Sequence, residues 1–180
     1  RLMDVLGLKA KIRMKKYRSY KGKEGIIAKN ILDRDFISDR PLEKLVTDVT
    51  EFRVENQKIY LSPLIDLCTS EVISFSISRS PSVSFVMKML EEGLTKSKYE
   101  NTMIHTDQGF QYQNIRFRKF LEEKSIIQSM SRKGNCYDNS LAENFFSHLK
   151  AEFYYKEKFN SIKDFIVRLT QYINYFNNDR

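Results

Sequence analysis

The stretch L-V-T-D-V-T-E-F, residues 45–52, decides the fold. Valine and threonine favour extended backbone, and apolar residues occupy both faces of the alternating pattern, as in a central strand that is covered on both sides. Aspartate is depleted in strands, and a carboxylate among buried neighbours is costly or takes up a proton unless something compensates its charge. Asp48 therefore predicts a buried strand that carries a charge in need of a partner.

Two more strand patterns follow closely, over residues 58–67 and 71–78. Pro63 cannot donate to a strand ladder, so it predicts a bulge or a locally unpaired position in the first of them. In the second, isoleucine and phenylalanine alternate with serine, which predicts a strand with one face in solvent. Three consecutive strands with short connections form an antiparallel meander.

The rest of the chain mixes helix patterns with two short strand patterns. Ser80 and Pro81 predict the N-cap and first residue of a helix that ends near Gly93, and Ser161 with Asp164 predicts a capping box for the last helix. The other expected elements are strands over 102–106 and 126–130, a helix between them with Phe117, Phe120 and Leu121 on one face, and a helix with Leu141, Phe145 and Leu149 on one face. This order predicts an α/β, ribonuclease H-like fold with a mixed five-stranded sheet, three antiparallel strands and then two parallel ones, flanked by helices.

A second aspartate ends the strand predicted over 102–106. In I-H-T-D-Q-G, residues 104–109, the apolar run stops on Asp107 and then turns. If the first and fourth strands are neighbours, Asp48 and Asp107 point at one place, where a divalent cation would satisfy both carboxylates. Mg²⁺ takes oxygen ligands, and two or three carboxylates with water suffice. Glu143, early in the next-to-last helix, is the candidate for the third acid, and two metals held in this way would serve an in-line phosphoryl displacement.

Each acid also has a simpler explanation. An aspartate before glycine often only shapes a turn, because its side chain accepts hydrogen bonds from nearby amides. Glu143 could be a solvated surface residue. Asp66, also in a strand, could be a buried partner for an arginine or an alternative ligand.

Composition indicates a globular protein of one domain with a basic N-terminal arm. The chain has 180 residues, 41% of them hydrophobic, two cysteines, and no apolar run near the roughly 20 residues that a membrane helix needs. Residues 1–25 hold nine of the 31 basic residues and two of the 23 acids. We therefore divide the chain into an arm and connector, 1–43, and a core, 44–180. Lys15, Lys16 and Arg18 are candidate phosphate contacts, although a solvated tail has the same composition.

Five motifs stand out along the chain: T-D-V-T-E-F (47–52), L-S-P-L-I-D (61–66), I-H-T-D-Q-G-F-Q-Y (104–112), Q-S-M-S-R-K-G-N-C-Y-D-N (128–139) and A-E-N-F-F (142–146). Together they resemble the catalytic domain of transposases from bacterial insertion sequences of the two-reading-frame type and, more distantly, retroviral integrases. Asp107 and Glu143 are separated by 35 residues, as in the Asp-Asp-35-Glu (DDE) signature of that family.

The resemblance implies roles for individual residues. Asp48, Asp107 and Glu143 match the metal-binding triad, which would hold Mg²⁺ or its substitute Mn²⁺, with two ions per site when DNA is bound. Lys150 matches a lysine near the reactive DNA end. The loop from Ser131 to Asn139 matches a mobile active-site loop, with Gly134 as hinge and with Arg132 and Lys133 as phosphate contacts. His105 is expected to lie behind the ligands, because Mg²⁺ prefers oxygen.

The resemblance also implies an activity and partners. It implies metal-dependent cleavage of double-stranded DNA at the ends of a mobile element and transfer of the freed 3′-hydroxyl into DNA, by an oligomer in the bacterial cytoplasm, on the nucleoid when DNA is bound. A helix-turn-helix region from an upstream reading frame would choose the DNA ends. Two alternatives remain open: a nuclease of the same fold that hydrolyses RNA in hybrids, and a DNA-binding subunit without catalysis.

Overall fold

The computed structural model describes residues 6–7, 25–96 and 98–180. The strands are β1 (Lys44–Thr47), β2 (Thr50–Val54), β3 (Gln57–Asp66), β4 (Val72–Ser78), β5 (Met103–Thr106) and β6 (Ile127–Met130). The helices are α2 (Val83–Gly93), α3 (Ile115–Glu123), α4 (Ser140–Leu149) and α5 (Ile162–Asn178), with a 3-10 turn η1 (Cys136–Asn139) before α4 and a π-helical turn η2 (Lys150–Tyr154) after it.

The strand predicted over 45–52 is interrupted at Asp48, so the sheet has six strands where five were expected. Its order is β2-β3-β1-β5-β6, with β4 on the other side of β3. Both halves of the interrupted strand pair with β3 in one register, Thr47 with Leu64 and Thr50 with Leu61. That register puts Pro63 opposite Asp48, and Pro63 has no N–H to donate to a ladder. The β3–β4 pairing also shifts register between Leu64 and Ile65, as expected near a strand proline.

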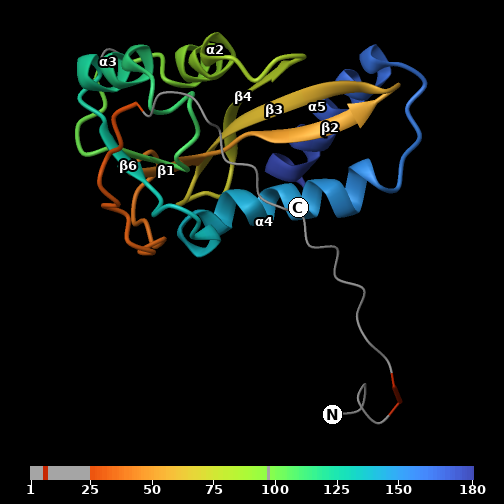
Figure 1. Ribbon diagram of the computed structural model, residues 1–180, viewed down its shortest axis with the longest axis horizontal. Coiled ribbons are helices and arrows are strands. Elements are labelled where there is room, and N and C mark those ends of the chain that lie inside the picture. Colours follow the sequence, from red (N-terminus) through yellow and green to blue (C-terminus); the bar gives the residue numbers. More distant parts are fainter. Residues whose placement is uncertain (1–5, 8–24, 97) are drawn as a thin grey trace.

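The sheet lies between two layers of helices, which confirms the ribonuclease H-like class. One hydrophobic core joins one sheet face to α4 and α5, and the other joins the opposite face to α2 and α3. Figure 1 shows α2 and α3 along one side of the sheet and α4 along the other. Neighbouring residues of β1 face the two layers, because Leu45 lies in the α2/α3 core and Val46 in the α4/α5 core.

Two local predictions were wrong. Helix α2 starts at Val83, and its N-cap is Ser82, whose hydroxyl accepts the Phe85 N–H; the predicted cap at Ser80 lies two residues too early. The serine face of β4 is also covered, because α2 packs over it: Ser76 is buried, and the Ser74 hydroxyl donates to the Met89 carbonyl at 2.8 Å. The predicted capping box of α5 is confirmed, with the Ser161 hydroxyl accepting the Asp164 N–H.

Residues 25–34, which we call the strap, run beside β6 (Figure 1). The Met130 N–H donates to the Lys29 carbonyl, and the Ser129 hydroxyl accepts the N–H groups of Ile31 and Leu32 at 2.9 and 3.0 Å. The Leu32 side chain is 2% exposed. The strap is therefore packed against the sheet, although its sequence carries no strand or helix pattern.

Side chains from the helical layer bind backbone groups at the edges of two other strands. The Tyr154 hydroxyl accepts the Arg53 N–H and donates to the Arg53 carbonyl in β2. The Asn177 amide makes the same pair of contacts with Val72 in β4. These contacts satisfy backbone groups that the sheet leaves without a partner strand.

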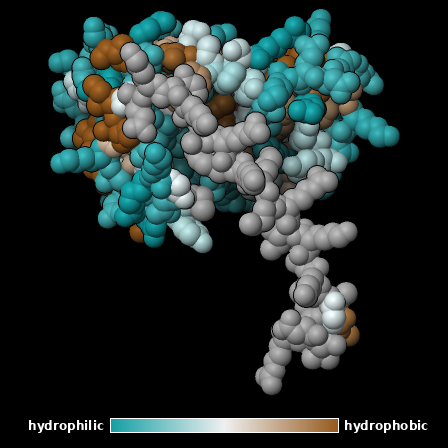
Figure 2. Space-filling view, in the orientation of Figure 1, coloured by the Kyte–Doolittle hydropathy of each residue, from teal (hydrophilic) through white to brown (hydrophobic). Residues whose placement is uncertain are grey.

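Most of the face seen in Figure 2 is hydrophilic, with hydrophobic residues gathered toward the end that carries α3 and β6. Among the described residues, no helix combines the length and apolar character that crossing a bilayer requires.

The aromatic centre of the α4/α5 core predicts a large stability effect at one position. Phe165 is fully buried, with ring centroids 4.9 Å from Phe159 and 5.3 Å from Phe52. We expect Phe165→Ala to lower the free energy of unfolding by about 3–5 kcal/mol in a urea titration, because it removes buried area and leaves a cavity. The control Val167→Ala, on the exposed face of the same helix, should cost less than about 1 kcal/mol. Similar losses in both variants would contradict the packing of α5.

Candidate active site

The parallel pairing of β1 with β5 brings Asp48 and Asp107 together. Val46 pairs with His105 in register, and each aspartate lies two residues further on, just past the end of its strand. Both side chains are half-buried. Two carboxylates at adjacent strand ends repel each other and lose solvation, so the arrangement favours binding of a cation or a proton.

Backbone amides hold both carboxylates in place. Asp107 Oδ1 accepts the Gly109 N–H at 2.8 Å, and Asp48 Oδ1 accepts the Val49 N–H at 2.7 Å. Asp107 therefore does shape the turn, as the simpler explanation supposed, while its carboxylate stays beside Asp48. Glycine is needed at 109, because a Cβ there would lie 2.9 Å from Asp107 Oδ1. The hydrogen bond that forms the turn thus also fixes the position of the Asp107 carboxylate.

The electrostatics agree with this geometry. Burial and then the charge of Asp107 raise the pKa of Asp48 to about 8, with Glu143 adding to the effect and Lys150 opposing it. Burial also raises the pKa of Asp107. The charges that act on Asp48 are therefore those of Asp107, Glu143 and Lys150, the residues that the sequence analysis assigned to the site.

Glu143 lies apart from the two aspartates. It is exposed on the first turn of α4, and partial burial raises the pKa of its carboxyl. Within the described ranges, no three side chains of the His, Cys, Asp and Glu types are grouped closely enough to hold a metal ion. Asp48 and Asp107 nevertheless fit a hard cation, because they are adjacent, poorly solvated carboxylates.

Lys150 lies where α4 changes from α-helical to π-helical geometry. Its amino group sits 5.7 Å from the centroid of the Phe52 ring and lowers the pKa of Asp48. Single π-helical turns in α-helices are frequently found at functional sites. Here the π-helical turn starts at Lys150, whose charge acts on Asp48.

His105 is buried behind the acids and does not point at them. The Ser129 hydroxyl already accepts two amides from the strap, so its own proton goes to His105 Nδ1 at 2.8 Å. Nε2 then carries the ring proton and donates to the Ser131 hydroxyl at 3.2 Å. Burial lowers the pKa of His105 to about 4, in agreement with a neutral ring. The histidine joins β5 to β6 rather than binding metal.

Asp66, the alternative ligand, has another function in the structure. Its carboxylate is 2% exposed and accepts the N–H groups of Leu42 and Cys68 at 2.7 and 2.8 Å. It pairs in register with Leu45, three residues before Asp48. Asp66 therefore stabilises loops rather than joining the acid pair.

The residues predicted to contact DNA differ in their surroundings. Arg132 makes a two-pronged ion pair with Asp138, Nε to Oδ2 at 2.8 Å and Nη2 to Oδ1 at 2.9 Å, so a phosphate would compete with this carboxylate. Lys133 is exposed on the same loop, where Gly134 has φ +72°. The arm residues Lys15, Lys16 and Arg18 lie outside the described residues.

Two residues near the site were not singled out from the sequence. Tyr112 ends the I-H-T-D-Q-G-F-Q-Y motif; its buried hydroxyl lies beside the hydroxyls of Thr47 and Ser62. Burial raises the pKa of Tyr112 further above its usual range, and so do the charges of Asp48 and Asp107. Asp138 is fully buried, and its ion pairs hold its pKa far below the usual range. Tyr112 and Asp138 both belong to motifs that resemble the transposase family, so the motifs could have identified them as candidate site residues.

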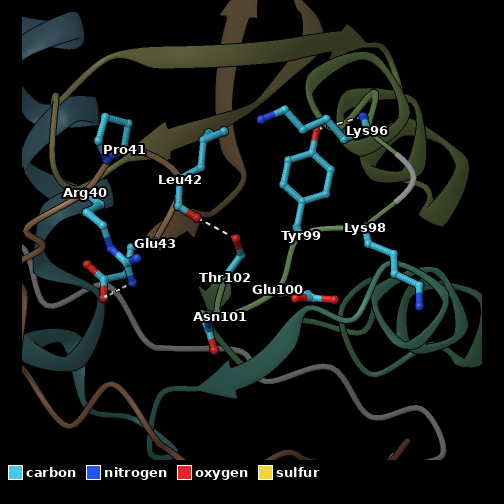
Figure 3. A pocket seen from close by; sticks show the side chains of 10 residues that line it. All are labelled: Arg40, Pro41, Leu42, Glu43, Lys96, Lys98, Tyr99, Glu100, Asn101 and Thr102. Carbon is cyan, nitrogen blue, oxygen red and sulfur yellow. Dashed lines mark hydrogen bonds and ion pairs between the residues drawn. The ribbon is translucent and has the colours of Figure 1, made fainter.

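A pocket elsewhere on the molecule is not part of this site. It is lined by residues 40–43, 96 and 98–102, which precede β1 and β5, whereas the acids follow those strands. Figure 3 shows cationic and anionic side chains mixed around it, including the Arg40–Glu43 ion pair at 3.7 Å. Because both signs of charge line this pocket, its charge favours neither an anionic nor a cationic ligand.

Solved structures of retroviral integrases and of a mariner transposase share this fold. A chain of the simian T-cell lymphotropic virus intasome matches 91% of this chain and 55% of its own length with TM-score 0.65 and 16% identity. The Mos1 mariner transposase catalytic domain matches with TM-score 0.60 and 13% identity over 74% of this chain and 70% of its own. The HTLV-2 integrase catalytic core, solved with magnesium, matches 78% and 86% of the two chains with TM-score 0.55 and 17% identity. The class is thus the integrase-like core fold.

Sequence comparison identifies the family. Two family models described as integrase core domain match residues 38–136 and 143–180, and this chain belongs to that family. The InsK transposase of insertion sequence element IS150 from Escherichia coli K12 is 49% identical over the whole chain, and a transposase-like protein of Haemophilus influenzae is 43% identical. The chain spans 64% of the first relative and 83% of the second.

The raised pKa of Asp48 predicts how stability responds to pH and to metal. In the folded state Asp48 binds its proton up to about pH 8, whereas in the unfolded chain it releases it near 3.8, so folding disfavours the charged form. In chelator, this residue's contribution to stability is therefore greatest below pH 4 and is lost as the pH rises toward 8. At pH 8, with a chelator present, Asp48→Asn should have a larger free energy of unfolding than wild type by at least about 1 kcal/mol. This lower bound corresponds to a pKa shift of less than one unit.

The test is a urea titration of both proteins at pH 5 and 8, with and without Mg²⁺. Added Mg²⁺ should stabilise the wild type at pH 8 and leave the variant nearly unchanged. An asparagine variant that is less stable at pH 8 in chelator would show that the two aspartates do not repel each other.

Proposed function

We propose that this chain is the catalytic core of a DDE transposase, which cleaves DNA at the ends of a mobile element and joins the freed 3′-hydroxyl to a second phosphodiester. The observation that supports the proposal most strongly is the pair of half-buried carboxylates, Asp48 and Asp107, at adjacent parallel strand ends in a chain of the integrase core family. A structural role alone does not explain why two poorly solvated carboxyl groups lie side by side, where each makes it costlier for the other to carry a charge.

The metal that fits this site is Mg²⁺, with Mn²⁺ as substitute and two ions when DNA is bound. Asp48 and Asp107 would hold it together, and Glu143 would join them once α4 is drawn in by DNA. When bound, such ions activate the attacking oxygen and stabilise the leaving oxygen of an in-line displacement.

The chain's own side chains orient the DNA in this proposal. Lys150 presents a positive charge beside Asp48, where it can pair with the phosphate next to the reacting one. The Gly109 N–H keeps the Asp107 carboxylate turned toward Asp48. Lys133 would guide the strand into the site from the loop before α4, together with Arg132 if its ion pair opens.

The partners follow from the same proposal. The substrate is double-stranded DNA, both element ends and target, bound by a homo-oligomer in the bacterial cytoplasm. The basic arm would add phosphate contacts through Lys15, Lys16 and Arg18. A helix-turn-helix region encoded upstream would supply recognition of the ends, while the core supplies the chemistry.

Removing one acid at a time tests the catalytic roles. We expect Asp48→Asn, Asp107→Asn and Glu143→Gln each to lower the rate of DNA joining by at least about a thousandfold, because each removes a charge that the transition state needs. The assay is joining of labelled element-end DNA with Mg²⁺ or Mn²⁺, by the full-length protein with its upstream region. DNA binding, measured in chelator, should remain.

The matched control is Glu122→Gln, which neutralises an exposed acid on α3. It should join DNA at the wild-type rate. A triad variant that joins DNA as well as this control would remove that residue from the mechanism. Cleavage of an RNA–DNA hybrid in preference to duplex DNA would instead identify a hybrid nuclease.

Salt dependence tests the arm. Replacing Lys15, Lys16 and Arg18 together by glutamine should reduce the slope of log affinity against log salt by about 2 to 3, since each neutralised phosphate contributes roughly 0.9. The measurement is DNA binding by fluorescence anisotropy between low and moderate salt, in chelator.

The control replaces three exposed lysines of α2, α3 and α5 in the same way, Lys88, Lys119 and Lys163. If both triple variants change the slope equally, the arm contributes only net charge and does not contact phosphates specifically.

A further inference from the structure

The loop that leads to Glu143 is tied to the strap through one buried carboxylate. Asp138 accepts hydrogen bonds from the strap residues Asn30, Nδ2 to Oδ2 at 3.1 Å, and Arg34, Nε to Oδ1 at 2.9 Å. It also accepts the backbone N–H of Arg132 at 3.0 Å, besides the two bonds from that guanidinium. Its side chain is fully buried. A carboxylate with this many donors fixes the relative position of the two segments.

Further contacts reinforce the tie. The Arg34 guanidinium lies 5.7 Å from the centroid of the Tyr137 ring, and the Arg132 guanidinium also reaches Asp33 Oδ1 at 3.1 Å. Ser129 holds the strap backbone and, through His105, is linked to Ser131 at the start of the loop. The strap is therefore attached to both ends of the loop.

The strap backbone has a strained conformation at the same point. Asp33 and Arg34 have φ values of +41° and +66°, a region that residues with side chains rarely adopt. The Asp33 N–H is held by Asn30 Oδ1 at 3.0 Å. Two consecutive left-handed residues persist only when surrounding contacts over-determine them, and here the conformation points Arg34 at Asp138.

In the described part of the chain, no side chain makes a cap hydrogen bond at the start of α4. Asn139 occupies the N-cap position but makes no cap hydrogen bond, and both polar atoms of its buried side chain lack partners among the described residues. Asp138 is the neighbouring residue, and Glu143 follows within the first turn. Ala142 and Phe145 pack one face of α4 into the core, and Asp138 holds the loop side of the helix start, where Glu143 lies.

We infer that Asn30 and Arg34 are positioning residues for the third acid: through Asp138 they hold the loop of residues 131–139 and the start of α4, and so keep Glu143 in the place from which it joins Asp48 and Asp107 when DNA binds. This role rests on the proposed function. The strap precedes residue 38, where the match to the integrase core family model begins, so the inference assigns a role to residues outside that match.

The test compares Arg34→Ala with Arg40→Ala in the full-length protein. Both changes remove one positive charge from the segment before β1, but Arg40 pairs with Glu43 and is 70% exposed. Two quantities are measured: hydrogen exchange of the amides in 131–139, and the rate of DNA joining at saturating DNA. We expect Arg34→Ala to speed loop exchange by at least about tenfold, as for loss of a hydrogen bond to a charged group.

We also expect Arg34→Ala to slow joining by about tenfold to a hundredfold, because small misplacements of catalytic groups cost that much. Arg34→Lys keeps a charged donor and should fall between wild type and Arg34→Ala in both measurements. Arg40→Ala should match wild type in loop exchange and in joining.

Three results would overturn the inference. Equal loop exchange in Arg34→Ala and Arg40→Ala would show that the tie does not hold the loop. Faster exchange with normal joining would show that the loop does not position Glu143. Slower joining without faster exchange would mean that Arg34 acts on DNA directly. Failure of the proposed function is separate, because the wild-type protein itself would then join no DNA.

Discussion

The parallel pairing of β1 with β5 is the constraint on which the rest of the structure depends. It sets Asp48 beside Asp107 at the cost of repulsion between two poorly solvated carboxylates. Pro63, opposite Asp48 in β3, coincides with the gap between β1 and β2 and so leaves that backbone out of the ladder. Helical layers on both faces keep the strand pair rigid, so the two acids cannot easily move apart.

Much of the fold could be predicted, because it depends on local patterns. Runs rich in apolar and β-branched residues predicted the strands, the Ser161 cap predicted the start of α5, and an aspartate within an apolar run marked Asp48 as unusual. Predictions failed where a distant segment decided the outcome. The serine face of β4 resembles a solvent face, yet α2 covers it, and close approach there needs Gly93, whose added Cβ would lie 2.3 Å from Ser74 Oγ.

The candidate site was predictable to a similar extent. The convergence of Asp48 and Asp107 follows from strand order, but the separation of Glu143 from them depends on how α4 is anchored. That anchor joins Arg34 to Asp138, residues 104 positions apart, and no periodicity connects them. Arg132 was expected to contact phosphate because it is basic and lies in a loop; only its ion pair with Asp138 shows that it also has a structural partner.

The strap has one more consequence, for association between molecules. β6 is the last strand of the sheet and pairs only with β5 among the described strands, so its far side would offer open N–H and C=O groups to a strand of another chain. Unprotected borders of this kind promote aggregation. Lys29 occupies part of that border by accepting the Met130 N–H. A shortened chain that begins at residue 38 would expose the border, and its poor solubility could be mistaken for a failure of the core to fold.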